Sequence, residues 1–207
     1  MGQVIPFRNP KKTNKPWITL RGAIARDDAE TVLRIAPQVN LDTVLVNGET
    51  PLQFAIGVRS PASVKALLAA GANIHAVGDG GMAALHYAAA AGDTETAEIL
   101  LAAGADPDPQ TTSGATALVY AAMLGREHMA RLLIRHGAAV DGFGGCRPLS
   151  YAAAMRHSGT VNLLLRHGAS AAGDGPECPA AMAAQGEDQE CVAAICAARI
   201  RGALQWQ

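Results

Sequence analysis

The sequence predicts an all-α protein in which short helix-turn-helix units stack along one axis. Three observations predict it. A pattern of turn, helix, helix and loop recurs four times with a period near 33 residues. Nearly half of the residues (49%) are apolar but only 4% are aromatic, and alanine is in clear excess. Glycines follow the apolar segments, where helices would end. Because alanine has the highest helix propensity and lets helices pack closely, this composition favours helices separated by short distances.

Two sets of residues show the repeat with the same spacing. Leucines near the start of each unit are separated by 33, 33 and 31 residues, and glycines near its end repeat those spacings. The leucines are Leu52, Leu85, Leu118 and Leu149, and the glycines are Gly71, Gly104, Gly137 and Gly168. A fixed period of this length indicates units that cannot bury their apolar faces alone and that stack on their neighbours.

Each unit divides into two short helices. Thr50 can cap a first helix that opens with proline, whose missing N–H costs nothing in the first turn. In the following units we expect this helix to end near Gly92 and Gly125, because glycine readily takes the left-handed conformation. A second helix follows with paired apolar residues, and we expect Leu101 and Leu133 on it to be buried.

With this period and this order of elements, the chain resembles the ankyrin repeat family. The best matches are "GGMAALHYAAAAGDTETAEILLAAGADPD" and "GATALVYAAMLGREHMARLLIRHGAAVD", and the resemblance runs from about residue 20 to 200. It implies an ankyrin-repeat solenoid with protruding β-turn fingers and about six repeats, including degenerate terminal caps. The expected organisation is a disordered basic lead-in at residues 1–16, a repeat domain at 17–203 and a tail at 204–207. A nucleic-acid-binding arm is the alternative interpretation of the lead-in.

The chain departs from the family pattern in two places. Only His86 occupies the family's histidine position, where the resemblance implies a structural hydrogen bond to the turn backbone. The loop before Leu149 is two residues shorter than its equivalents, so we expect a clipped or bent finger around Phe143.

The resemblance implies recognition of a protein partner on a concave face made of fingers and first helices. The predicted partner-binding residues occupy variable positions of the motif: Glu49, Asp79, Met82, Thr112, Ser113, Met123, Leu124, Phe143, Met155 and Glu177. Five of them are apolar where the family surface is commonly polar. An exposed apolar stripe with a polar rim indicates an interface, whereas in the alternative interpretation these side chains bury among themselves.

Charge is distributed unevenly along the chain, although the net charge is only −1. Residues 67–125 contain six acidic residues and no lysine or arginine. Such an acidic belt would attract a basic partner and repel nucleic acid; the alternative is a solvated face that matters only for solubility. No apolar run is long enough to span a bilayer, so we expect no membrane association.

No recognisable catalytic or metal-binding motif stands out. The six histidines form no triad with serine and aspartate, and His136 and His167 occupy equivalent helix ends that suggest a capping role. The four cysteines (Cys146, Cys178, Cys191 and Cys196) include no CxxC pair and are expected to be free thiols in a reducing cytoplasm. We therefore expect no enzyme activity, cofactor or metal.

Two functions are compatible with these features. The first is a cytoplasmic binding module, monomeric when free, that acts as a bacterial regulator or an immunity-type inhibitor of a cognate toxin or enzyme. The alanine-rich array resembles small bacterial ankyrin proteins of this kind. The second is a secreted bacterial effector or scaffold that engages host proteins.

Overall fold

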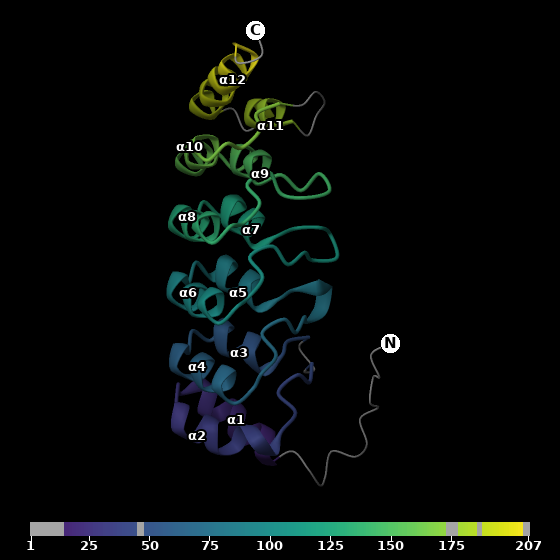
Figure 1. Cartoon of the computed structure of the whole chain (residues 1–207), viewed down its shortest axis with the longest axis vertical. Coiled ribbons are helices and arrows are strands. Elements are labelled where there is room, and N and C mark those ends of the chain that lie inside the picture. The colour runs from purple at the N-terminus through teal and green to yellow at the C-terminus, as the bar shows by residue number, and fades with distance from the viewer. Residues whose placement is uncertain (1–14, 45–47, 173–177, 186–187, 205–207) are drawn as a thin grey trace. The chain divides into compact units, whose positions relative to one another are not determined.

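The computed structural model describes residues 15–44, 48–172, 178–185 and 188–204. Within these residues the chain forms twelve α-helices and two short 3-10 turns (Figure 1). The helices follow one another as six pairs, which confirms the all-α class and agrees with the expected number of repeats. The chain divides into two compact units, residues 1–73 and residues 74–207.

The first unit contains two helix pairs. Its elements are α1 (Lys15–Ala25), α2 (Ala29–Ile35), the 3-10 turn η1 (Ala36–Gln38), α3 (Pro51–Gly57) and α4 (Pro61–Ala69). Apolar side chains from all four helices are fully buried between them, including Leu20, Ile24, Val32, Leu52, Ile56, Val64 and Leu67. Helix α1 packs on α2 and α3, and α2 packs on α4, so each pair closes the apolar face of its neighbour.

A capping box starts α3, as the Thr-Pro sequence predicts. The side-chain oxygen of Thr50 accepts a hydrogen bond from the backbone N–H of Gln53 (3.3 Å), and Oε1 of Gln53 accepts one from the N–H of Thr50 (2.8 Å). Two backbone donors at the helix start are thereby satisfied reciprocally. Gln53 takes this role at the position where the next repeat has His86.

Two polar side chains join the helix pairs of the first unit. Asp27 lies in the turn between α1 and α2, and its carboxylate accepts a 2.7 Å hydrogen bond from the backbone N–H of Ser63 near the start of α4. The buried hydroxyl of Ser60 donates to the carbonyl of Ile24 (2.7 Å). The first repeat therefore caps the second helix of the next repeat.

The second unit contains four helix pairs. The first helices are α5 (Ala84–Ala91), α7 (Ala117–Met123), α9 (Pro148–Ala154) and α11 (Pro179–Gln185); the second helices are α6 (Thr94–Ala102), α8 (Glu127–Arg135), α10 (Ser158–Arg166) and α12 (Gln189–Leu204). A 3-10 turn, η2 (Asp79–Gly81), precedes α5. The first helices pack on one another in sequence and form one row, and the second helices form another (Figure 1).

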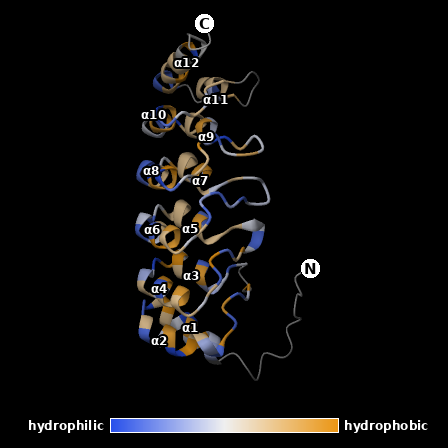
Figure 2. Ribbon diagram, in the orientation of Figure 1, coloured by the Kyte–Doolittle hydropathy of each residue, from blue (hydrophilic) through white to orange (hydrophobic). Residues whose placement is uncertain are grey.

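Each helix from α5 to α10 contributes at least one buried leucine to the core between the rows. Leu85, Leu100, Leu118, Leu133, Leu149 and Leu164 are each at most 1% exposed. Leu101 is also buried, so the predicted burial of Leu101 and Leu133 is confirmed. Figure 2 shows hydrophilic residues on the side of α8 that faces away from α7. The leucines that recur at the repeat spacing are therefore the residues that form the core.

The expected domain boundaries fall close to helix ends. Helix α1 begins at Lys15, ahead of the expected domain start at Trp17, and α12 ends at Leu204. Residues 1–14, which make up most of the predicted lead-in, and residues 205–207 lie outside the described residues. No helix in the described part of the chain has both the length and the hydrophobicity to cross a membrane.

In the five helix pairs whose turns are described, from α1–α2 to α9–α10, the turn contains a residue in the left-handed conformation. Gly92 and Gly125 supply it after α5 and α7, with φ of 69° and 63°. After α9, however, Arg156 takes the same conformation with φ of 63°. A residue with a Cβ atom is strained there by about 1–2 kcal/mol.

Replacing Arg156 with glycine is therefore expected to stabilise the protein. Arg156→Ala is the matched control, because it removes the same side chain beyond Cβ and keeps the backbone strain. We expect the glycine variant to be more stable than the alanine variant by about 1 kcal/mol in urea denaturation. Equal midpoints for the two variants would show that the turn is not strained.

Candidate partner-binding surface

Three finger loops that are described throughout their length precede α5, α7 and α9: residues 75–83, 108–116 and 141–147. They extend on the side of α5, α7 and α9 (Figure 1). Together with the exposed side chains of these three helices they form what we call the finger-side surface. Most of the predicted partner-binding residues of this unit lie on it.

The finger loops bond to one another. The backbone N–H of Thr112 donates to the carbonyl of Gly80 on the preceding finger (2.8 Å), and the thiol of Cys146 donates to the carbonyl of Ser113 (3.2 Å). Gly81 has φ of 73°, and a Cβ atom there would lie 3.0 Å from the backbone nitrogen of Thr112. This close approach and positive φ both require glycine, so the contact between the first two fingers is made by backbone groups, and the third finger is joined through the Cys146 thiol.

Three aspartates at equivalent positions each join their repeat to the next loop. Oδ1 of Asp42 accepts from the backbone N–H of Asn73 in the first unit (2.9 Å). In the second unit Asp108 accepts from the N–H of Ala139 (2.9 Å for Oδ2) and Asp141 from that of Ser170 (2.7 Å). We call these bonds the aspartate ladder. Burial raises the pKa of Asp108 above its usual value, the main opposing effect being its bond from Ala139.

His86 connects two fingers at the start of α5. Its ring is fully buried; Nδ1 accepts a hydrogen bond from the N–H of Ala83 (3.0 Å), so Nε2 carries the proton and donates to the carbonyl of Ala115 (3.1 Å). The edge of this ring meets Tyr120 at a centroid distance of 5.6 Å. The structural role implied by the family resemblance is therefore confirmed for His86. Burial lowers the pKa of His86 from 6.5, more than its backbone hydrogen bonds raise it.

The lowered pKa of His86 predicts a loss of stability in mild acid. The unfolded chain binds a proton near pH 6.5, before the folded protein does, so this contribution is complete above that pH and declines as the pH falls toward the folded-state pKa. His86→Gln keeps an acceptor for Ala83, as Gln53 does for Thr50 in the preceding repeat. We expect it to cost about 0.5–1.5 kcal/mol at neutral pH, because the Ala115 carbonyl loses the bond from Nε2 of His86 and keeps the one from the N–H of Thr111 (3.0 Å).

The variant should also show a shallower fall in the free energy of unfolding between about pH 7 and pH 5. Urea denaturation at several pH values measures both slopes. The same slope in both proteins would contradict the assignment of this pH dependence to His86.

The short third finger is bent tightly, as its length predicts. Phe143 and Cys146 form an isolated antiparallel bridge, and the N–H of Cys146 donates to the carbonyl of Phe143 (2.9 Å). Gly142 has a positive φ of 67°, and a Cβ atom there would collide with the backbone carbonyl of Cys146. The turn leaves the Phe143 ring 38% exposed.

The apolar residues predicted for this surface differ in exposure. Leu124 (41%), Phe143 and Met155 (50%) are exposed, whereas Met82 and Met123 are half-buried. Met82 packs against the next repeat, where the hydroxyl of Tyr120 donates to its sulfur (3.3 Å). The alternative interpretation, burial among neighbouring side chains, therefore fits Met82 and Met123 in part. The interface interpretation remains a prediction for the three exposed side chains.

These exposed residues lie at opposite ends of the first helices: Leu124 and Met155 at the C-terminal ends, and Phe143 before an N-terminal end. Leu124 follows α7 and Met155 follows α9 at equivalent positions, and these two helices pack together. Phe143 precedes α9, so about 10 Å of helix separates it from Met155. Asp79, Thr112 and Ser113 are exposed on the fingers. Of the remaining predicted residues, Glu49 lies half-buried in the first unit and Glu177 lies outside the described residues.

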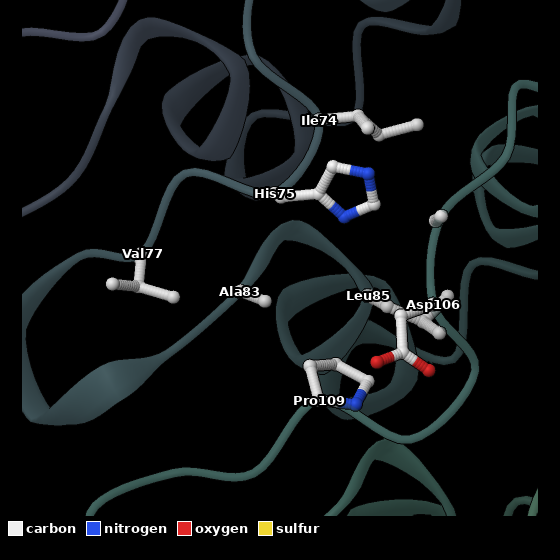
Figure 3. A pocket seen from close by; sticks show the side chains of 8 residues that line it. Ile74, His75, Val77, Ala83, Leu85, Asp106 and Pro109 are labelled. Carbon is white, nitrogen blue, oxygen red and sulfur yellow. The ribbon is translucent and has the colours of Figure 1, made fainter.

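Sequence reasoning did not find a small pocket at the base of the first two fingers. It has a volume of about 190 Å³, and Ile74, His75, Val77, Asp106 and Pro109 are among the residues that line it (Figure 3). A signal was available in the sequence. The ladder positions Asp42, Asp108 and Asp141 recur at multiples of 33, and the missing member of the series is His75.

All four cysteines are free thiols. Cys191 is fully buried, and its thiol donates to the carboxylate of Asp188 (3.1 Å). Burial is the largest cause that raises the pKa of Cys191 to about 12, and the Asp188 charge adds to it. This thiol is therefore protonated and unreactive at neutral pH. In the part of the chain that the structure describes, no three His, Cys, Asp or Glu side chains are placed to share a metal ion.

Comparison with known families supports the same conclusion as the repeat geometry. The family model described as ankyrin repeats (3 copies) matches residues 20–111 and 85–173, which together span more than half of the chain. The chain therefore belongs to the ankyrin repeat family.

A solved structure has a similar fold. The crystal structure of the human ASB11 ankyrin repeat domain aligns with a TM-score of 0.74 at 24% identity, and the alignment covers 92% of this chain and 84% of that one. This degree of identity shows the fold alone. No curated protein matches the sequence significantly.

Proposed function

We propose that this chain binds a partner protein through the finger-side surface of its second unit. Ankyrin repeats are general protein–protein interaction modules, and the family is a non-catalytic scaffold. The observation that carries the proposal is the exposure of Leu124 and Met155 at equivalent positions of adjacent repeats. Apolar side chains that lie together in an otherwise polar surface favour an interface, and methionine adapts to a partner's shape.

The partner is proposed to have a basic surface. Asp79 is exposed on the first finger loop and Asp106 is exposed just before the second, and residues 67–125 contain no lysine or arginine. This arrangement favours encounter with positively charged proteins and opposes binding to nucleic acid phosphates or anionic membranes. We also propose that the chain is monomeric when free, has no enzymatic activity, and acts in the cytoplasm, where free thiols persist.

Within this class we propose a bacterial regulator, most specifically an immunity-type inhibitor of a cognate toxin or enzyme. Inhibition requires only a rigid complementary surface, and the bonded finger loops supply such a framework. A secreted effector or scaffold that engages host proteins uses the same kind of surface and is the second candidate.

Affinity capture distinguishes these roles. The full-length chain and its Leu124→Asp/Met155→Asp variant serve as paired baits in lysates of the native cells and of host cells. Recovery of a toxin or enzyme by the unsubstituted bait alone supports the inhibitor role, and recovery of host proteins alone supports the effector role. Equal recovery by both baits would contradict binding through this surface.

A further inference from the structure

The pocket at the base of the first two finger loops coincides with an interruption of the aspartate ladder. Asp108 and Asp141 each accept a hydrogen bond from the loop that follows their own repeat. The equivalent residue at the start of the first finger is His75. The imidazole is larger than a carboxylate, and here it lines the pocket together with Asp106, the residue that the ladder would bond. The pocket therefore lies at the position of the series where a histidine stands in place of the aspartate.

The size of the pocket limits what it can hold. Its volume of about 190 Å³ is below the roughly 300–1,000 Å³ typical of sites for small molecules and cofactors. The pocket lies beside Val77, which is 51% exposed on the finger, so it opens near the finger-side surface. A single side chain from another protein fits these dimensions better than a free ligand.

The lining combines apolar walls with negative charge. Ile74, Val77 and Pro109 line it with aliphatic surface, and Asp106 contributes a carboxylate (Figure 3). The Asp108 carboxylate lies close enough for the Asp106 charge to raise the pKa of Asp108 further. Since the sequence from 67 to 125 contains no lysine or arginine, no permanently charged cation of this segment lies beside these two carboxylates, and His75 is the basic side chain in the lining.

We propose that this pocket receives a lysine or arginine side chain of the partner protein. The aliphatic stem lies along Ile74, Val77 and Pro109, and the cationic group meets the Asp106 carboxylate. Long basic side chains bury their methylene groups against apolar surface while the charge stays near water. The apolar lining residues and the exposed Asp106 carboxylate offer both environments. The inference rests on the proposed function, because it assumes a protein partner on the same side of the second unit.

Butylguanidinium, which reproduces an arginine side chain, tests the pocket without the partner. We expect its addition to the full-length chain to shift the amide NMR signals of Val77 and Asp106 in a saturable manner. Neutral butylurea, of nearly the same shape, is expected to produce much smaller shifts. Asp106→Asn preserves an acceptor for the N–H of Asp108, which Oδ1 of Asp106 now binds at 2.9 Å. It should weaken butylguanidinium binding by about fivefold, the upper end for a partly exposed ion pair.

Asp79→Asn is the matched control, because Asp79 is exposed on the first finger, whose base lines the pocket, and the substitution removes the same charge. It should leave binding of butylguanidinium unchanged. Equal weakening by both variants, equal binding of butylurea, or shifts spread over the whole surface would each overturn the proposal. Since the probe requires no partner, a negative result here together with partner binding that depends on Leu124 would refute the pocket and leave the proposed function standing.

Discussion

Replacing Leu133 with alanine is expected to lower the free energy of unfolding by about 2–5 kcal/mol. Leu133 is fully buried in α8, where it packs within the core shared by successive repeats. Because stacked repeats depend on their neighbours, a cavity in this middle repeat also weakens the interfaces on both of its sides. Urea denaturation followed by circular dichroism measures the loss.

Leu124→Ala is the matched control for this effect. It makes the same change in the same repeat at a side chain that is 41% exposed, so we expect a change within about 0.5 kcal/mol. If Leu133→Ala proved as mild as this control, the assignment of the core register would be wrong.

Charging the apolar surface is expected to have the largest effect on binding. In Leu124→Asp/Met155→Asp, two carboxylates would replace apolar side chains that we propose to pack against apolar groups of the partner. The cost of several kcal/mol for desolvating such charges corresponds to a loss of affinity of about a hundredfold or more. The fold should be retained, since both side chains are exposed in the free protein. Circular dichroism and surface plasmon resonance with the captured partner measure the two quantities.

The sequence predicted the core of the fold accurately because the core follows a fixed period. Leu101 and Leu133 are buried where the repeat places them. Thr50 caps its helix because a threonine oxygen accepts from the free backbone N–H groups of the first turn, where the following proline also fits. Such features depend on residues within one repeat or at equivalent positions of the next, so one sequence contains enough information to find them.

The details of the surface were less predictable because they depend on contacts between different positions of successive repeats. Met82 and Met155 occupy variable positions and look alike in the sequence. Met82 is half-buried because Tyr120 of the next repeat reaches its sulfur, whereas Met155 stays 50% exposed. The pocket is lined by His75, which replaces one aspartate of a series whose structural role becomes evident only from the bonds to Asn73, Ala139 and Ser170.

The central claim is that the partner binds the finger-side surface, and titration calorimetry on two variants tests it most directly. Met123→Asp places a charge on α7 beside Leu124, and Glu98→Lys reverses a charge on the exposed face of α6, in the other helix row. With both proteins shown to be folded, we expect Met123→Asp to abolish binding of the captured partner and Glu98→Lys to change its affinity little. Loss of binding in Glu98→Lys with unchanged binding in Met123→Asp would place the partner on the second helices and contradict the account.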